Sequence, residues 1–387
     1  MKYAERMKKL GTETAFEVLA KAKALEAQGK NIIHLEIGEP DFDTPAHIVD
    51  TAVKSLQNGR THYCPAAGIP ELRKAVCDDV MRRRGVHFEP ENVVITPGAK
   101  PIMYFVINAL IGEGDEVIYP NPGFPIYESV IDFSGGKSVP LPLKEEKGFS
   151  FDVNDLKRLV TDRTRLIILN SPANPTGGIV GKEDVKAVAE IARERGIMVM
   201  SDEVYKNIIY EGEHASILCE PGMEDLAILL DGFSKTYAMT GWRLGFGVMP
   251  KDLAVKIERL MINSNSCTAP FTQDAGVAAL NGPHDACDEM VQEFSRRREV
   301  IVKGLNQMPG VSCIMPKGAF YAFPNVKEVP MKSRELADLI LNEAHVAVLS
   351  GTAFGEYGDG YLRLSYANSI PNIEEGLNRM SKVLNNL

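Results

Sequence analysis

A lysine, a serine and an arginine within one short stretch form the most informative chemical pattern in this sequence. Lys235 directly follows Ser234, and Arg243 comes eight residues later. A hydroxyl and a guanidinium beside a lysine suit a phosphate dianion, because arginine donates paired hydrogen bonds to phosphate oxygens. A lysine in such surroundings can form a Schiff base with an aldehyde. Most loop lysines face solvent, so the neighbouring residues are what single out Lys235.

A carboxylate and a phenol follow another apolar run. Asp202 comes directly after residues 197–201, and Tyr205 lies three residues further on. A carboxylate at this point can simply cap a helix or belong to a loop. It can also pair with a protonated pyridinium nitrogen, whose positive charge lets an aromatic ring act as an electron sink. Tyr205 is then near enough to bond an oxygen on the same ring.

Two further loops and one strand carry polar groups. The prolines and glycines of residues 170–178 indicate a rigid loop, and the amide of Asn174 is its candidate ligand group. Residues 97–100 open a helix, where free backbone N–H groups attract anions. Arg363 lies in the alternating segment 361–365 and is either a solvent-facing edge residue or a bidentate clamp for a substrate carboxylate.

The elements that must position these residues alternate along the chain between about residues 48 and 290. Short, nearly continuous apolar runs are typical of strands buried on both faces, and helix-period segments separate them. Such alternation predicts an α/β fold with a mostly parallel sheet, whose ligands lie beyond the carboxyl ends of the strands. The expected strands are 93–95, 116–119, 166–169, 198–200, 227–230 and 244–248, with helices at 101–111 and 182–195.

The pattern changes after about residue 290. It predicts a large domain at 48–290, a smaller α+β domain at 291–387, and an N-terminal segment, 1–47, that packs with the small domain. The elements expected there are a long helix at 285–305, short strands around 311–314 and 319–322, a helix at 333–344, a strand at 361–365 and a closing helix from 370.

Composition excludes several classes of protein. The chain of 387 residues has a net charge of −9 and thus no electrostatic footprint for nucleic acid or an anionic membrane. Its basic runs, 82–84 and 296–298, are expected to be solvated helix faces. The six cysteines are scattered, which argues against a metal site and favours a reducing compartment. Without a leader or a long apolar stretch, the chain is expected to be soluble and cytoplasmic.

Taken together, the motifs resemble those of the class I/II aminotransferases of pyridoxal-phosphate (PLP) fold type I, and most closely the bacterial aspartate-aminotransferase-like branch. The resemblance covers essentially the whole chain, in order. It implies a seven-stranded, mostly parallel sheet between helices, a small α+β domain built from both termini, and a homodimer with shared active sites. The motifs are Gly38–Phe42, Asn174–Gly177, Asp202–Tyr205, Ser234–Gly245 and Arg363–Tyr366.

The resemblance also implies a role for each site residue. Lys235 would bind PLP as a Schiff base and later move the substrate proton. Asp202 would pair with the pyridine nitrogen, Asn174 and Tyr205 would bond the ring oxygen, and the ring of Phe124 would stack on the cofactor. The phosphate would be held by Gly98, Ala99, Ser234 and Arg243, and by Tyr63 from the other subunit. Arg363, Asn174 and Gly38 would bind the substrate, with Arg363 on its α-carboxylate.

Two departures from the family pattern concern the phosphate and the substrate. Gly232 stands where many relatives have a serine, and no arginine or lysine occurs between residues 259 and 296 to bind a second substrate carboxylate. Lys100, counted among the cofactor-binding residues, is the alternative partner for that carboxylate, which points to aspartate or glutamate with 2-oxoglutarate as acceptor. If Lys100 only supports the phosphate or faces solvent, neutral or aromatic donors would fit beside Phe16 and Tyr321.

Two other functions compete with transamination. A PLP-dependent lyase, such as a carbon–sulfur lyase or an aminocyclopropane-carboxylate synthase-like enzyme, would have the same cofactor site, because a fold does not fix a reaction. A ligand-sensing module of a transcription regulator would need a DNA-binding domain. The roughly 45 residues before the large domain show no helix-turn-helix pattern.

Overall fold

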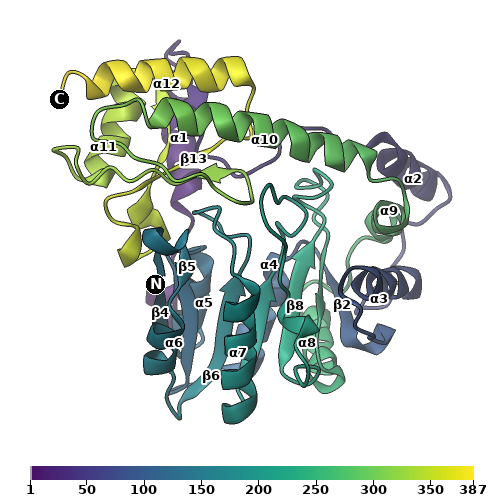
Figure 1. Cartoon of the computed structure of the whole chain (residues 1–387). Coiled ribbons are helices and arrows are strands. Elements are labelled where there is room, and N and C mark those ends of the chain that lie inside the picture. The colour runs from purple at the N-terminus through teal and green to yellow at the C-terminus, as the bar shows by residue number, and fades with distance from the viewer. Residues whose placement is uncertain (1) are drawn as a thin grey trace.

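An eight-stranded sheet forms the centre of the protein in the computed structural model, which describes residues 2–387 (Figure 1). The order across the sheet is β2-β9-β8-β7-β6-β3-β4-β5. Strand β9 is antiparallel to both neighbours, β5 is antiparallel to β4, and the remaining pairs are parallel. In chain order the strands are β2 (Val93–Thr96), β3 (Glu116–Asn121), β4 (Lys137–Lys144), β5 (Ser150–Phe151), β6 (Thr164–Asn170), β7 (Met198–Asp202), β8 (Ala227–Gly232) and β9 (Gly245–Val248).

Helices cover both faces of this sheet, which is why its strands are apolar on both sides. In β6, Ile167 and Leu169 pack into one core cluster, whereas Leu166 and Ile168 pack into another. The first cluster includes α2 (Ala46–Gln57), α3 (Pro70–Arg84), α6 (Val153–Leu159), α7 (Lys182–Arg195) and α9 (Pro270–Asn281). The second includes α4 (Lys100–Leu110), α5 (Ile126–Phe133) and α8 (Lys251–Ser264). The predicted α/β class with a mostly parallel sheet is confirmed.

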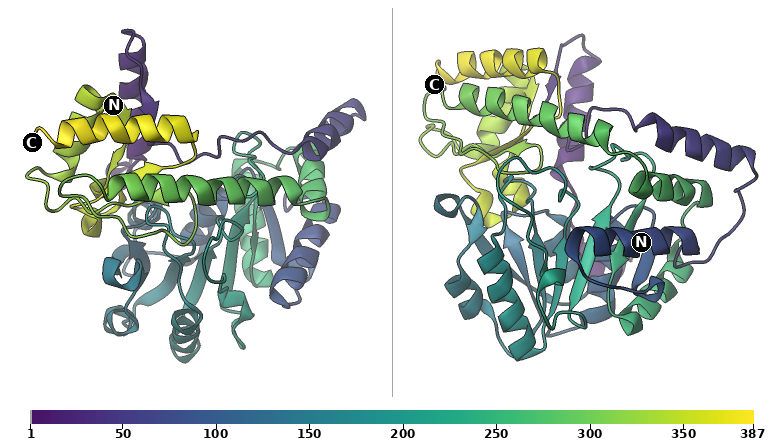
Figure 2. Two further views of the ribbon diagram at one scale, coloured as in Figure 1. Left: turned by 45° about the horizontal axis from the view of Figure 1, so that its top comes forward. Right: turned by 45° about the vertical axis from the view of Figure 1, so that its right-hand side comes forward.

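A second layer of structure lies above the carboxyl ends of the strands. Helices α10 (Asp285–Leu305) and α12 (Ile370–Leu384) pack side by side there (Figure 2). Below them β13 (Leu362–Ser365) pairs with β10 and β12, and β1 pairs with β11, so residues 33–34 join the C-terminal part of the chain. The remaining elements are α1 (Thr14–Glu26), β1 (Ile33–His34), β10 (Tyr321–Ala322), α11 (Ser333–Leu339), β11 (Val346–Ala347) and β12 (Leu349–Ser350). The domain limits at 47 and 290 stay predictions, and α10 runs through residue 290.

Short helical turns complete the structure. They are η1 (Glu5–Lys9), η2 (Pro90–Asn92), η3 (Glu145–Lys147), η4 (Ile217–Cys219), η5 (Ile340–Ala344), η6 (Gly351–Phe354) and η7 (Glu356–Gly358). The helix expected at 333–344 is therefore divided, because α11 ends at Leu339 and continues as the π-helical turn η5. The sheet has eight strands rather than seven, since β5 adds a two-residue edge strand that is too short to leave a periodic signal.

The strand expected around residues 311–314 does not form. Only Ser312 makes an isolated bridge, to Asn325. The side chain of Asn306 satisfies the backbone at Cys313 instead, accepting from its N–H at 2.8 Å and donating to its carbonyl at 2.9 Å. A side chain that satisfies both backbone groups removes the need for a neighbouring strand.

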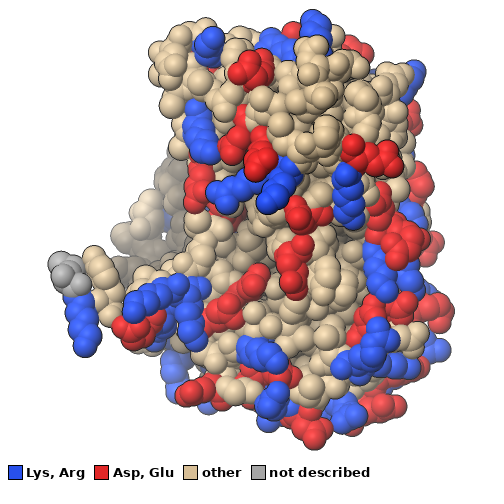
Figure 3. Space-filling model, turned by 90° about the vertical axis from the view of Figure 1, so that its left-hand side faces the viewer, with Lys and Arg blue, Asp and Glu red and all other residues tan. Residues whose placement is uncertain are grey.

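Charges of both signs are interspersed on the face shown in Figure 3. The two basic runs are not simple solvated faces, because Arg84, Arg297 and Arg298 have buried side chains that pair with carboxylates. Between residues 2 and 387 no helix has the length and apolar character needed to cross a membrane. Within that same range, no three His, Cys, Asp or Glu side chains group so that they could hold a metal ion.

Candidate active site

A cavity of about 460 Å³ lies at the carboxyl ends of β6, β7 and β8, below the C-terminal layer. Eleven of the thirteen residues that the sequence analysis selected line this cavity. They are Gly38, Ala99, Lys100, Phe124, Asn174, Asp202, Tyr205, Ser234, Lys235, Arg243 and Arg363. Gly98 lies directly behind its wall, and Tyr63 is elsewhere.

Lys235 projects into the cavity from the loop after β8. Its Nζ donates to the backbone carbonyl of Gly38 at 2.5 Å and lies 5.9 Å from the ring centre of Tyr205. Burial lowers the pKa of Lys235 to about 8, with the positive charge of Arg363 acting in the same direction. A lysine with this pKa has a substantial neutral fraction near neutral pH, and the neutral amine is the nucleophile.

Asp202 ends β7 and is buried. One carboxylate oxygen accepts a hydrogen bond from the Tyr127 hydroxyl at 2.6 Å, and the other accepts from the Val204 N–H at 3.3 Å. Burial raises the pKa of Asp202 to about 6, although these two hydrogen bonds oppose the shift. A cation facing Asp202 across the cavity would therefore stabilise its ionised form.

The sequence analysis missed Tyr127, which is fully buried on α5. Phe124 lies just before α5, and the backbone N–H of Tyr127 donates to its carbonyl at 3.1 Å, so a turn at the helix start places the two residues together. The two rings are in edge-to-face contact, with centres 5.6 Å apart. Tyr127 thus links the wall formed by Phe124 to the carboxylate of Asp202.

Tyr205 and Tyr321 form a buried pair whose hydroxyl oxygens lie 2.7 Å apart. Burial raises the pKa of Tyr205 well above its usual value, so its hydroxyl stays protonated and can donate to a ligand oxygen. Gly38 lies against the same pair, and a Cβ atom at this position would overlap the Tyr321 hydroxyl. The tight approach explains why a glycine is needed here.

Arg363 and Asn174 approach one another from opposite sides of the cavity. The guanidinium of Arg363, from β13, donates to the Asn174 side-chain oxygen at 3.2 Å and to the backbone carbonyl of Glu36. It also lies over the ring of Tyr321, 4.7 Å from its centre. Its Nε atom is buried without a hydrogen-bond partner among residues 2–387. A buried guanidinium with a spare donor is costly alone and suits an incoming carboxylate.

One corner of the cavity has the features of an anion site. Gly98, which has a φ of +94°, precedes α4, and a Cβ atom on it would overlap the guanidinium of Arg243. One N–H group of the Arg243 guanidinium donates to the Thr240 carbonyl at 2.7 Å. Arg243 and Ser234 both line the cavity. A Cβ at Gly232 would lie 3.3 Å from the Ala99 Cβ, so a serine there would be tightly packed in this chain.

An ion pair that the sequence did not predict forms part of the cavity wall. Lys100, at the start of α4, pairs with Glu13, which precedes α1. The Lys100 ammonium also lies 5.3 Å from the ring centre of Phe124. No motif or spacing connects residues 13 and 100, so only the tertiary structure brings them together.

Tyr63 does not join these residues within one chain. It is 90% exposed and contributes nothing to the cavity wall. Its expected role, which requires a second subunit, stays a prediction.

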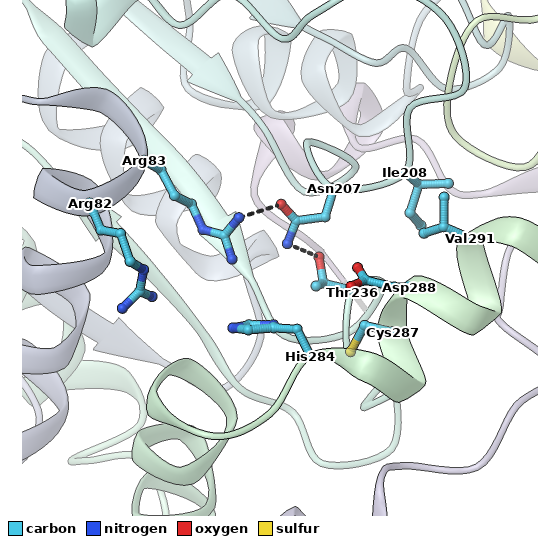
Figure 4. A pocket seen from close by; sticks show the side chains of 9 residues that line it. All are labelled: Arg82, Arg83, Asn207, Ile208, Thr236, His284, Cys287, Asp288 and Val291. Atoms are coloured by element: carbon cyan, nitrogen blue, oxygen red, sulfur yellow. Dashed lines mark hydrogen bonds between the residues drawn. The ribbon is translucent and has the colours of Figure 1, made fainter.

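A second cavity, of about 400 Å³, lies between α3 and the start of α10 (Figure 4). Arg83 donates to Asp79 at 2.8 Å and to Asn207 at 3.1 Å, and Asn207 donates to Thr236 at 3.3 Å. This chain of hydrogen bonds ends at Thr236, the residue after Lys235, and thereby supports the loop that carries Lys235.

Comparisons with known proteins agree with this geometry. The family model for aminotransferase class I and II matches residues 30–380. The aspartate aminotransferase of Pyrococcus abyssi is 42% identical over 359 residues, covering 92% of either chain. The aromatic-amino-acid aminotransferase 2 of Thermococcus litoralis is 41% identical over 363 residues, covering 92% of this chain and 93% of its own. The structure of the Thermus thermophilus aspartate aminotransferase with maleate has a TM-score of 0.94 at 34% identity, covering 99% of this chain and 100% of its own.

The family match includes every residue expected to bind the cofactor or the substrate. The similar proteins are named as aminotransferases, which does not favour the lyase alternative. Members of this family depend on PLP, so PLP is the expected cofactor. The chain belongs to the class I and II aminotransferase family and is a PLP-dependent transaminase.

Proposed function

We propose that this enzyme transfers the amino group of an L-amino acid, with aspartate or another dicarboxylic or neutral amino acid as donor, to a 2-oxo acid such as 2-oxoglutarate. The observation that carries the proposal is that Lys235, Asp202 and Arg363 surround one cavity. These three side chains supply an amine, a buried carboxylate and a carboxylate-binding guanidinium. The relatives named for aspartate and for aromatic amino acids support both kinds of donor.

The cavity fits PLP on chemical grounds. Burial lowers the pKa of Lys235, which favours the neutral amine that binds an aldehyde, and Asp202 is a buried acceptor suited to the ring nitrogen. Tyr205 and Asn174 are the donors for the ring oxygen, and Phe124 is the stacking ring. The phosphate would lie against Ser234, Arg243, Ala99 and the glycine-permitted turn at Gly98. When bound, PLP stabilises negative charge at the substrate α-carbon.

Each protein group then has a defined task. Arg363 orients the substrate by its α-carboxylate, so that the α-carbon lies near Lys235. The Lys235 Nζ is the group that would move the proton at that carbon. Asp202 would hold a proton on the ring nitrogen of the bound cofactor, and the surrounding aromatic rings would exclude water from these charges.

A half-reaction screen tests the reaction type and the donor. The purified PLP form is mixed with single amino acids without an acceptor, and the absorbance of the lysine-bound cofactor is followed. A transaminase is expected to lose this absorbance stoichiometrically, release one 2-oxo acid per site, and recover it when 2-oxoglutarate is added. Repeated turnover without an acceptor would indicate a lyase and would overturn the proposal.

Tyr127 is expected to tune Asp202. Its hydrogen bond lowers the pKa of that carboxyl group, so Tyr127→Phe should raise the pKa and keep Asp202 protonated to higher pH. The pH below which PLP affinity declines should therefore rise. At neutral pH the affinity for PLP should fall about tenfold, because a hydrogen bond to a charged group is lost. The measurement is the PLP dissociation constant against pH.

Tyr119→Phe is the matched control, because Tyr119 is buried in the same core cluster and bonds Asn121 rather than Asp202. If Tyr127→Phe and Tyr119→Phe give the same pH profile, the link between Tyr127 and Asp202 would have to be abandoned.

We further propose a cytoplasmic homodimer in which Tyr63 completes the partner's phosphate site. The exposure of this tyrosine supports a role outside its own chain, and the six free cysteines support a reducing compartment. Tyr63→Ala should weaken PLP binding about tenfold without loss of stability.

Subunit mixing tests this sharing directly. A dimer of Tyr63→Ala and Lys235→Ala subunits would have both lesions in one site and an intact second site. At a PLP concentration low enough to leave Tyr63→Ala sites largely empty, equal mixing should therefore restore about a quarter of the wild-type sites. Unchanged activity after subunit exchange, verified by mass spectrometry, would contradict sharing.

A further inference from the structure

The ion pair between Glu13 and Lys100 connects the two layers of the protein. Helix α1, which begins directly after Glu13, packs on β11 and β12 of the C-terminal layer. Helix α4, which begins at Lys100, packs on α5 and α8 against the sheet. The pair therefore joins the two layers at the active-site cavity, and both side chains line that cavity.

Lys100 is the positive group that a second substrate carboxylate would meet, and the protein already gives it a carboxylate. The Glu13 side chain is 20% exposed and that of Lys100 is 46% exposed, so the pair is accessible to solvent. Apolar surface adjoins it, because Phe124 lies under the ammonium and the 60% exposed ring of Phe16 lines the same cavity. At this place a charged substrate side chain would meet the ion pair, whereas an uncharged one would meet the aromatic rings.

We propose that Glu13 stands in for the side-chain carboxylate of a substrate and sets the choice between dicarboxylic and neutral amino acids. This inference rests on the proposed function. A dicarboxylic substrate must displace Glu13 from Lys100, since two carboxylates on one ammonium repel each other. A neutral or aromatic substrate leaves the pair in place and rests on Phe124 and Phe16. One site thereby accepts both classes, and Glu13 penalises only the dicarboxylic one.

The test compares Glu13→Gln with wild type in two ways. The first readout is the affinity of the PLP form for succinate and for 3-phenylpropanoate, two unreactive carboxylates, by calorimetry. The second is kcat/KM for aspartate and for phenylalanine. Succinate affinity and kcat/KM for aspartate should both rise about three- to tenfold, the range for a partly exposed ion pair. The affinity for 3-phenylpropanoate and kcat/KM for phenylalanine should change less than about twofold.

Two further variants separate specificity from structure. Glu17→Gln, one turn along α1 and exposed outside the cavity, should change neither ligand class. In a Lys100→Ala background the gain from Glu13→Gln should disappear, because the two substitutions act on one pair.

Equal changes for both ligand classes, or a fall in succinate affinity, would overturn the role of Glu13. So would a gain that persists without Lys100. Failure of the proposed function is distinguishable: an enzyme that transaminates no amino acid would refute that function, whereas the two affinities would still report on Glu13.

Discussion

Replacing Lys235 by alanine is expected to reduce turnover by at least about 10²- to 10⁴-fold, the contribution of a positioned acid–base group. The structure gives the reason, because Lys235 lines the cavity and burial lowers its pKa to about 8. The variant should fold normally, since among residues 2–387 the Lys235 ammonium has a hydrogen bond only to the Gly38 carbonyl.

A covalent label distinguishes this role from a general effect on the site. Borohydride should fix PLP to the peptide that contains Lys235, and Lys235→Arg, which keeps the charge but not the nucleophile, should give no label. The rate at which the cofactor-free enzyme captures PLP should rise with pH to a plateau above about 8, because only the neutral amine attacks the aldehyde. A label on another lysine, or turnover within tenfold of wild type for Lys235→Ala, would refute the assignment.

The sequence predicted those cavity residues that lie at or just after the carboxyl end of a strand. Asp202 ends β7, Lys235 comes three residues after β8, and Asn174 comes four residues after β6. Parallel strands bring these positions to one edge of the sheet, so an apolar run followed by a polar residue was enough to select them. Arg363 reaches the same cavity from a strand of the other layer, and its selection depended on the family motif.

Contacts between distant side chains were not predictable from the sequence. Arg84 and Glu203 form a buried ion pair, as do Lys206 and Asp231. In the sequence, Arg84 is only one member of a basic run at a helix end, where arginine commonly faces solvent. Burial is decided by the packing of α3 against the loops after β7 and β8, and no spacing along the chain encodes it. The pair of Glu13 and Lys100 escaped prediction for the same reason.

Asp202 is expected to have the second largest effect. Asp202→Ala should retain bound PLP through Lys235 but lose about 10²- to 10³-fold in turnover, a typical loss for a preorganised charge in a water-poor site. Asp202→Glu should recover part of the rate, because it restores a carboxylate near the ring nitrogen. Near-wild-type turnover in Asp202→Ala would sink the proposal that this carboxylate sets the protonation of the cofactor.

The pH dependence of stability gives an independent test that needs no turnover. In the cofactor-free enzyme burial raises the pKa of Asp202 from 3.8 to about 6, so the folded state binds this proton more tightly than the unfolded state. The stability that the neutral carboxyl group contributes is therefore present below pH 4 and lost as the pH rises through 6. Asp202→Asn, which stays neutral, should accordingly gain free energy of unfolding relative to wild type between pH 4 and 6 and keep that gain at pH 7.

With PLP bound, the wild type should instead be more stable than Asp202→Asn, because a cation beside Asp202 stabilises its charged form. Denaturant titrations at pH 4 and 7, with and without PLP, measure both effects, and an Asn variant less stable than wild type at pH 7 without PLP would show that the buried carboxylate is already compensated by the protein itself.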